Sequence, residues 1–309
     1  MVIEVAGVTA EVLCRYAENA RMFQDYTTDK PPELTIAPTD ADIHNMQAIL
    51  DDLAEKQGEP LQRYSDSELE SNVVYCTLCE ALIDHDVLPM HGSALCMDGA
   101  AYIFAAKSGT GKSTHSRLWR EVYGDRVWMI NDDKPVVKVT DGRAAVYGTP
   151  WTGKHRLGCN ASAPLKAIVR LSRDDENHIE RLSDADAFQM LMERSYFSRD
   201  PARMARIVAL VNRLVHAAEF YSLGCNMSPE AAIVSHDGMN AGKICRPPAP
   251  GSAIDNTVRK EVVLWKSTKH RSWKSSKCRM TSSFAPPVVA PQTVAKTVVP
   301  GIAKIGSGK

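Results

Sequence analysis

Residues 106–114 read Ala-Lys-Ser-Gly-Thr-Gly-Lys-Ser-Thr, and the rest of the chain is interpreted around this stretch. An apolar run at 100–105 precedes it and an amphipathic run at 115–122 follows it, so we expect a strand, a glycine-rich turn and a helix. Gly109 and Gly111 allow successive backbone N–H groups to point inward, and the start of a helix adds partial positive charge at the same place. The stretch therefore predicts a phosphate-binding turn.

The stretch matches the pattern G-x-x-x-x-G-K-[ST] except at its first position, which is Ala106. We therefore expect the turn to open differently from that of ordinary ATPases and GTPases. In this pattern the lysine reaches the β- and γ-phosphates and the following hydroxyl ligates Mg²⁺, roles that we predict for Lys112 and Ser113. The predicted ligands are ATP and Mg²⁺. The residues expected to bind the nucleotide are Ser108, Gly109, Thr110, Gly111, Lys112, Ser113 and Thr114.

The 309-residue chain has a net charge of zero, but its charges are unevenly distributed. Residues 1–243 contain 25 Lys and Arg against 35 Asp and Glu, whereas residues 244–309 contain 12 against 2. We interpret this change as a domain boundary. The tail is rich in Pro, Ser and Lys without a sustained period, so we expect disorder. Its basic segment at 265–279 either binds nucleic acid or an acidic partner, or is a solvated appendage.

No stretch approaches the roughly 20 apolar residues that span a bilayer, and the N-terminus lacks the basic segment of a signal peptide. We therefore expect a cytoplasmic protein without a membrane partner. Eight cysteines show no disulfide spacing, which suits a reducing compartment. Cys76 and Cys79 form C-x-x-C within a helical apolar pattern, and we interpret them as core thiols rather than a zinc or redox site.

Residues 1–87 are predicted to form an N-terminal α+β layer. Short strands before residue 37 are followed by helices at 40–54 and 67–83, the second of which has a Ser65-x-x-Glu68 capping signal. Residues 88–243 are predicted to form an α/β nucleotide-binding domain. Its expected strands are 88–96, 100–105, 126–130, 136–139, 144–147, 165–171 and 219–223, and its expected helices after the first are 184–194, 201–216 and 229–239.

Asp132 and Asp133 follow an apolar strand that comes after the expected turn and helix. Phosphoryl transfer needs a phosphate cradle, a divalent cation and a group that accepts the proton of the attacking hydroxyl. Side chains alternate in direction along a strand, so one carboxylate is expected to hold Mg²⁺ while the other acts as the base. The alternative is that the pair forms an ordinary polar turn.

Four further side chains are candidates for the same site. His91 lies on the strand that we expect to precede the turn strand, and either ligates a second metal when neutral, contacts the γ-phosphate when charged, or is structural. Lys154 and Arg156 lie in a loop with glycines on both sides. They either neutralise the charge of the transferring group or are simply exposed. Trp151, just before them, either flanks a ligand or packs in the core.

The order M-H-G-S-A at 90–94, S-G-T-G-K-S-T at 108–114 and N-D-D at 131–133 resembles the shared core of HPr kinase/phosphorylase and ATP-dependent phosphoenolpyruvate carboxykinase. The resemblance covers about 88 to 158, with weaker agreement to about 243. It implies a mixed β-sheet with flanking helices and a phosphate loop that binds ATP.

The resemblance also implies roles for individual residues. Lys112 and Ser113 match the loop lysine and its metal-binding hydroxyl, Asp132 and Asp133 match the paired aspartates, and His91 matches the histidine of both families.

Two other segments limit the resemblance. G-T-P-W-x-G-K at 148–154 looks like HPr-kinase-like proteins of bacterial peptide-modification gene clusters. The E-[IV]-R-G signature of HPr kinase/phosphorylase is replaced by Ala-Val-Tyr-Gly at 145–148, so neither the reverse reaction nor hexamer-based regulation is implied.

We therefore predict an ATP-dependent kinase that phosphorylates a hydroxyl of a protein or peptide, with serine as the favoured acceptor. The alternative is a non-catalytic ATP-binding regulatory protein whose basic tail binds a partner or nucleic acid. A phosphatase-like or carboxykinase-like activity is the third possibility. The sequence leaves the acceptor and the oligomeric state open.

Overall fold

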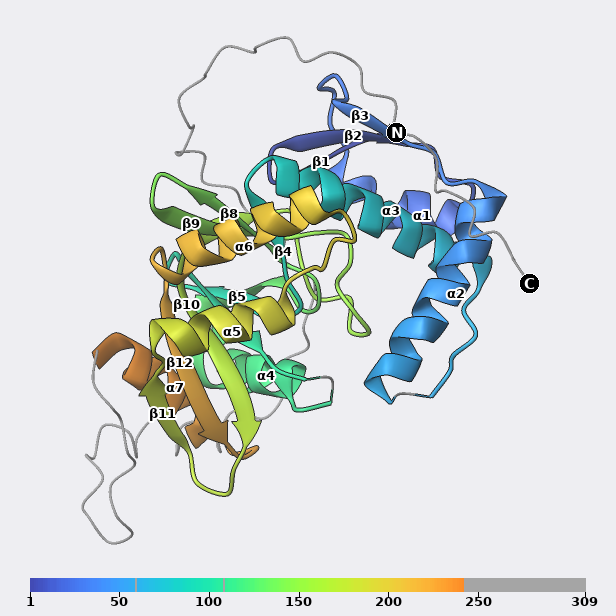
Figure 1. The fold of residues 1–309 in the computed structure, drawn as a ribbon. Helices are drawn as coiled ribbons and strands as arrows, with labels where there is room; N and C mark the ends of the chain where they lie inside the picture. Colours follow the sequence, from blue (N-terminus) through green and yellow to red (C-terminus); the bar gives the residue numbers. More distant parts are fainter. Residues whose placement is uncertain (59, 108, 242–309) are drawn as a thin grey trace, which may run out of the picture. The chain divides into compact units, whose positions relative to one another are not determined.

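The chain folds as a mixed α/β protein in a computed structural model, which describes residues 1–58, 60–107 and 109–241 (Figure 1). All of these residues belong to one compact unit. The predicted tail, 244–309, lies outside the described residues.

A mixed sheet of nine strands forms the centre of this unit. Its strands are β4 (Val87–Pro89), β5 (Ser93–Met97), β6 (Ala100–Ala105), β7 (Val127–Asn131), β8 (Val136–Thr140), β9 (Arg143–Tyr147), β10 (Ser162–Arg173), β11 (His178–Arg181) and β12 (Glu219–Cys225). The long strand β10 joins two parts of the sheet: its first residues pair antiparallel with β9, and its later residues pair parallel with β6 and β12.

The sheet has a hydrophobic core on each face, because side chains alternate in direction along a strand. On β6, Ile103 and Ala105 contact the core beneath α5 (Asp184–Arg194) and α6 (Pro201–Val215). Tyr102 and Phe104 face the opposite core, under α4 (Lys112–Tyr123) and α7 (Glu230–Ala241). The helices shown in Figure 1 therefore cover both faces of the sheet.

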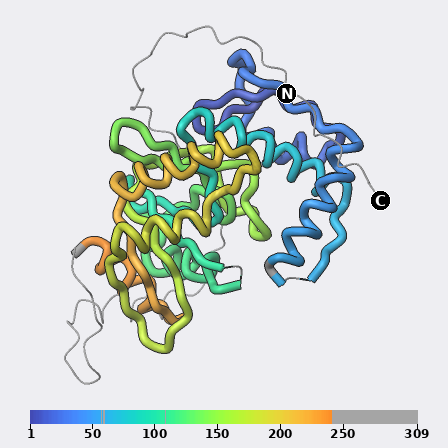
Figure 2. Tube along the Cα trace, in the orientation of Figure 1, coloured from blue at the N-terminus to red at the C-terminus, as the bar shows by residue number. Residues whose placement is uncertain are grey.

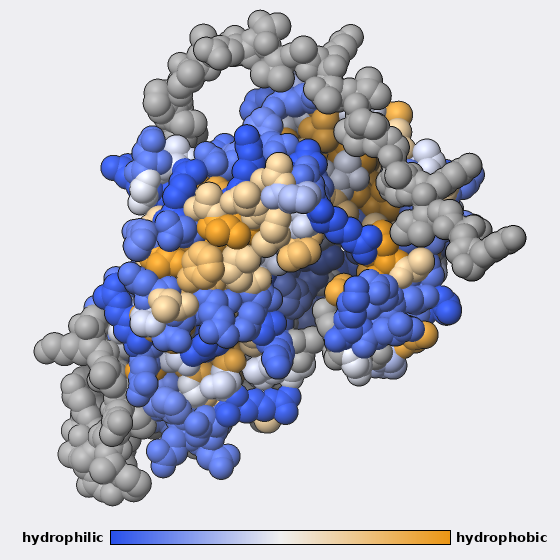
Figure 3. All heavy atoms as spheres, viewed as in Figure 1, coloured by the Kyte–Doolittle hydropathy of each residue, from blue (hydrophilic) through white to orange (hydrophobic). Residues whose placement is uncertain are grey.

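The outer surface of α5 and α6 is partly apolar. Figure 3 shows apolar side chains gathered over these two helices. On α6, Val208 is 40% exposed, and in the connection between the helices Phe197 is 70% exposed.

The N-terminal residues form a second layer. A small sheet of β1 (Val2–Val5), β2 (Val8–Val12) and β3 (Leu34–Ile36) shares a core with α3 (Asp66–Asp84). Trp151 belongs to this core, and its Nε1 donates to Oγ of Ser71 (2.9 Å), so its interpretation as a packing residue is confirmed. The layer also contains α1 (Ala17–Met22) and α2 (Asp40–Gln57).

The connection from α2 to α3 runs back along α2, as the tube in Figure 2 shows. The Gln47 side-chain amide donates to O of Gln62 (3.0 Å), and Nη1 of Arg63 lies 2.9 Å from Oδ2 of Asp51. The predicted cap of α3 is confirmed, because Ser65 and Glu68 form a reciprocal capping box.

The strand predicted over residues 88–96 is wrong. It is divided into β4 and β5, so His91 lies in the link between them and not on a strand. The Gly92 N–H donates to O of Asp133 (3.0 Å), which draws the link toward the end of β7. A Cβ at position 92 would lie 2.8 Å from Cγ2 of Ile103, so glycine permits this close passage.

Candidate active site

The turn between β6 and α4 presents backbone N–H groups at the start of a helix. Lys112 is the first residue of α4 and Gly111 is its N-cap residue. Gly109 has a φ of +74° and Gly111 a φ of +125°, values that residues with a side chain rarely adopt. The first N–H groups of a helix have no partner within it, so this end of α4 suits an anion. Ser108 lies outside the described residues.

Asp132 is buried, and its carboxylate accepts a hydrogen bond from one serine hydroxyl, which is bonded in turn to a second. Ser93 Oγ donates to Oδ1 of Asp132 (2.6 Å), and it also lies 2.6 Å from Oγ of Ser116. Ser116 belongs to α4, so this network joins the end of β7 to that helix. Ser113 precedes Ser116 by three residues and therefore lies on the same side of α4, one turn closer to the glycine turn.

Asp133 has a different environment from its neighbour. Its side chain is 28% exposed, and its Oδ1 lies 3.4 Å from Nδ1 of His91. The Asn131 side-chain oxygen accepts from the N–H groups of Asp133 (2.9 Å) and Lys134 (2.7 Å), which fixes the backbone here. A Cβ on Gly153 would lie only 3.0 Å from Cβ of Asp133, so this glycine lets the 153–156 turn approach the carboxylate.

Lys112 lies within electrostatic reach of both aspartates. Burial lowers the pKa of its ammonium group, whereas the charges of Asp133 and, to a smaller extent, Asp132 raise it. Its Nζ donates to O of Ala106 (3.2 Å). The structure thus brings together the lysine that starts α4 and the two carboxylates at the end of β7.

His91 is the fourth member of this cluster. Burial lowers the pKa of its imidazole, and the charges of Lys112 and Arg194 lower it further, against the opposing effect of Asp133. Of the states considered from the sequence, this environment favours the neutral ring. The backbone N–H of His91 donates to the backbone O of Arg194 (2.8 Å). This bond holds the link between β4 and β5 against the end of α5.

Sequence reasoning did not place Arg194 in the site. Its side chain is 19% exposed, and its charge acts on both His91 and Lys112. It belongs to a helix distant in sequence, and no local motif marks it. Ser93 and Ser116 were also missed, although Ser93 stands within the M-H-G-S-A segment and Ser116 has helical spacing from Ser113.

Lys154 and Arg156 are exposed in the 153–156 turn. Gly153 brings this turn against Asp133, but among the described residues neither cationic side chain has a hydrogen bond or an ion pair. The structure therefore places their turn beside the aspartates without fixing their charged groups there.

A pocket of about 740 Å³ opens beside the glycine turn. Thr110 and Thr114 line it together with residues from the ends of β10 and β12. His115 also lines it and is fully buried: its Nε2 accepts from Nε1 of Trp119 (3.1 Å), while its Nδ1 has no partner among the described residues. Burial lowers the pKa of His115 to about 3.

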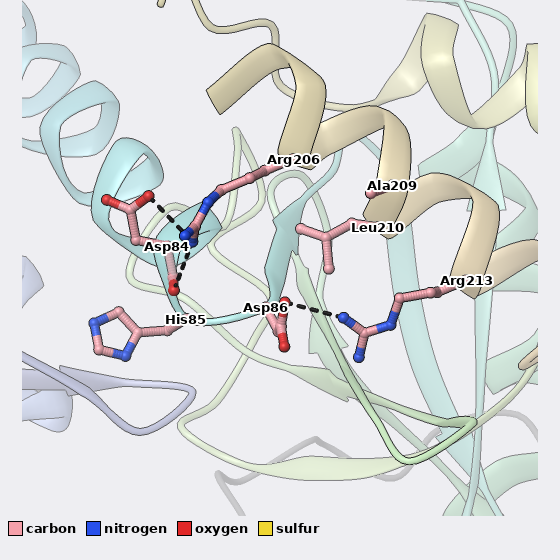
Figure 4. Close-up of a pocket in the computed structure, with 7 residues that line it drawn as sticks. All are labelled: Asp84, His85, Asp86, Arg206, Ala209, Leu210 and Arg213. Carbon is pink, nitrogen blue, oxygen red and sulfur yellow. Dashed lines mark hydrogen bonds and ion pairs between the residues drawn. The ribbon is translucent and has the colours of Figure 1, made fainter. Parts of the chain in front are cut away.

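A smaller pocket of about 430 Å³ lies between the end of α3 and α6 (Figure 4). Arg206 pairs with Asp84 (3.6 Å), and Arg213 pairs with Asp86 (3.0 Å). The two arginines that line it are thus paired with its two aspartates, and none of its lining residues belongs to the predicted site.

The described residues contain neither a cluster of metal-ligating side chains nor a helix suited to span a membrane. No group of three or more His, Cys, Asp and Glu residues in 1–58, 60–107 and 109–241 is arranged to hold a metal ion. No helix within these ranges has the length and apolar character needed to cross a membrane.

Comparison with known proteins finds similarity to solved structures and not to family models or curated sequences. No protein-family model matches the sequence, and no curated protein matches it. Among solved structures, the chain is similar to the HPr(Ser) kinase/phosphatase from Coxiella burnetii, with a TM-score of 0.28 and 9% sequence identity. This match covers 50% of the present chain and 95% of the other.

Proposed function

We propose that this chain is an ATP-dependent kinase that transfers the γ-phosphoryl group to a hydroxyl of a protein or peptide, with serine as the favoured acceptor. One observation carries the proposal: hydrogen bonds from Ser116 through Ser93 to Asp132 hold α4 against the end of β7. The helix that begins with Lys112 at the glycine turn is thereby joined to the strand end that bears both aspartates. A turn that suits phosphates, a lysine and two adjacent carboxylates are the parts that phosphoryl transfer uses.

In this proposal the glycine turn and the start of α4 bind the nucleotide phosphates. The N–H groups near Gly111 would donate to phosphate oxygens, and the Lys112 ammonium group would contact the β- and γ-phosphates. Ser113 and Thr114, at the start of the helix, complete the phosphate-binding segment.

Ser113 and Asp132 are the proposed Mg²⁺ ligands. Both offer oxygen donors, which Mg²⁺ prefers. Ser113 lies one helical turn before Ser116, and Ser116 is bonded through Ser93 to Asp132, which supports the pairing of Ser113 with Asp132. Mg²⁺ sites commonly use one or two carboxylates, substrate phosphates and several waters, so a group of three protein carboxylates is not required. Mg²⁺ bound there supplies positive charge to the phosphates. The Ser93 hydroxyl orients the Asp132 carboxylate.

Asp133 is the proposed general base, because it is the more accessible of the two carboxylates. The acceptor oxygen bonds to the γ-phosphorus, the bond from that phosphorus to the bridging oxygen breaks, and ADP leaves with the electron pair. The hydroxyl proton passes to the Asp133 carboxylate. A neutral His91 ring 3.4 Å from this carboxylate orients it.

Arg194, Lys154 and Arg156 are proposed to offset the negative charge of the transferring group. Arg194 already acts on Lys112 and His91, while Lys154 and Arg156 lie in the turn that contacts Asp133. Cations aimed at charge that develops in the transition state lower the barrier.

The proposal is tested by incubating the full chain with γ-labelled ATP, Mg²⁺ and a panel of acceptors that includes HPr, free serine and serine peptides encoded near its gene. Label in one acceptor, lost with Lys112→Ala, is the expected result. ATP binding by the parent chain without transfer to any acceptor, and with no ATP turnover, would instead support the regulatory alternative.

A further inference from the structure

The side chain of Arg173 holds the glycine turn from outside. Its Nη2 donates to O of Gly109 (2.6 Å), and its Nε donates more weakly to O of Thr110 (3.4 Å). Arg173 is the last residue of β10, where it pairs with Cys225 of β12. The guanidinium group therefore extends from a strand that is paired inside the sheet.

These two bonds determine which way the peptide N–H groups of the turn point. A trans peptide is planar, and its C=O and N–H point in opposite directions. Because the carbonyls of Gly109 and Thr110 turn toward Arg173, the N–H groups of Thr110 and Gly111 turn away from it. The Thr110 N–H donates to O of Lys107 (3.2 Å). Among the described residues, the Gly111 N–H has no acceptor.

The turn needs such a restraint, because glycine rotates readily about its backbone bonds. Gly109 and Gly111 both have positive φ, and no atom within 4 Å would meet a Cβ at either position. Side-chain packing therefore does not hold these peptides in place, and other orientations are open to them.

We propose that Arg173 is a positioning residue that keeps the Gly111 N–H directed at the nucleotide phosphates. This inference rests on the proposed function, since it requires phosphates beside the turn. Arg173 acts through the two carbonyls that it bonds, so its effect should be present before any nucleotide binds.

The test compares Arg173→Met, which keeps the stem but has no donors, with Arg173→Lys, which retains donors and charge. Arg143→Met is the matched control, because Arg143 is an exposed arginine at the β8–β9 hairpin. Calorimetry measures ADP binding in the presence of Mg²⁺. Spectra of the free ¹⁵N-labelled full chain report the amide signals of Gly109, Thr110 and Gly111.

Arg173→Met should shift or broaden these amide signals without nucleotide and weaken ADP binding by about tenfold, the scale expected when hydrogen bonds of a charged group are lost. Arg173→Lys should restore both properties in large part, and Arg143→Met should change neither. Unchanged amide signals in Arg173→Met would overturn the inference, whether or not affinity falls. A parent chain that does not bind ADP would instead count against the proposed function.

Discussion

The Ser93 hydroxyl donates a 2.6 Å hydrogen bond to the buried carboxylate of Asp132. The adjacent carboxylate, that of Asp133, lies instead at the partly exposed edge of the site beside His91. Two aspartates that are neighbours in sequence therefore have different surroundings, and this difference underlies the separate roles proposed for them.

Ser93→Ala should weaken Mg²⁺ binding in the ATP complex. The substitution removes the donor that orients Asp132, and loss of such a supporting bond typically reduces metal affinity about 10- to 100-fold. The Mg²⁺ concentration for half-maximal transfer should rise accordingly. Ser71→Ala is a suitable control, since it removes a serine hydrogen bond with Trp151 outside the site. An equal Mg²⁺ requirement in all three proteins would refute the proposed role of Ser93.

Gly153→Ala should destabilise the protein and reduce phosphoryl transfer. Gly153 has a φ of +69°, and an added Cβ would lie 3.0 Å from Cβ of Asp133. Gly142→Ala is a close control, because Gly142 has a φ of +71° but no atom within 4 Å of an added Cβ. Both substitutions should cost about 1 kcal/mol of unfolding free energy for the left-handed backbone.

Gly153→Ala alone should lower the free energy of unfolding by more than this amount, and it should also displace the Asp133 side chain. Denaturant unfolding and initial transfer rates measure the two effects. If Gly142→Ala slows transfer as much as Gly153→Ala does, the contact with Asp133 is not the cause.

Arg194→Met should raise the pKa of His91. The guanidinium charge disfavours protonation of the imidazole, so its removal shifts the His91 titration toward higher pH. Titration of the His91 ring signals by NMR measures the shift, with Arg199→Met as a control at a nearby exposed arginine. An unchanged His91 pKa would show that Arg194 does not act on the cluster.

His115 should make the protein sensitive to acid. Burial lowers its pKa to about 3, against an ordinary value of 6.5, so the folded state holds the ring neutral. The unfolded chain takes up this proton below pH 6.5 and the folded state does not, so stability falls as pH decreases from 6.5 toward 3. Well below pH 6.5 the loss is about 1.4 kcal/mol per pH unit.

His115→Gln should reduce this slope, whereas His44→Gln at an exposed position of α2 should not. Urea unfolding between pH 7 and pH 5 measures how the free energy of unfolding changes with pH in each protein. Identical slopes in the parent and in His115→Gln would contradict the burial effect.

Local sequence signals predicted much of the fold. Apolar periodicity placed the helix Asp184–Arg194 and the two strands β8 and β9, and the Ser65 cap marked the start of α3. The break at His91 was not predicted, because it depends on Gly92 passing close to β6 and bonding to Asp133, both distant in sequence.

Only part of the candidate site was predicted, because its other residues come from distant segments of the chain. Lys112, Asp132 and Asp133 were found from the glycine turn and from a strand that ends in two acids. Arg194 reaches the site through tertiary packing of α5, and Arg173 through the end of β10, so neither has a nearby motif. Contacts between distant segments leave no periodic pattern in the sequence.

In the proposed mechanism Asp133 accepts the proton of the attacking hydroxyl while Lys112 and the glycine turn hold ATP. The most direct test measures the rate of γ-phosphoryl transfer and the affinity for ATP in the parent chain and in Asp133→Asn. We predict a rate about 10²- to 10⁴-fold lower with an affinity close to that of the parent. Transfer at the parental rate in Asp133→Asn would contradict the claim.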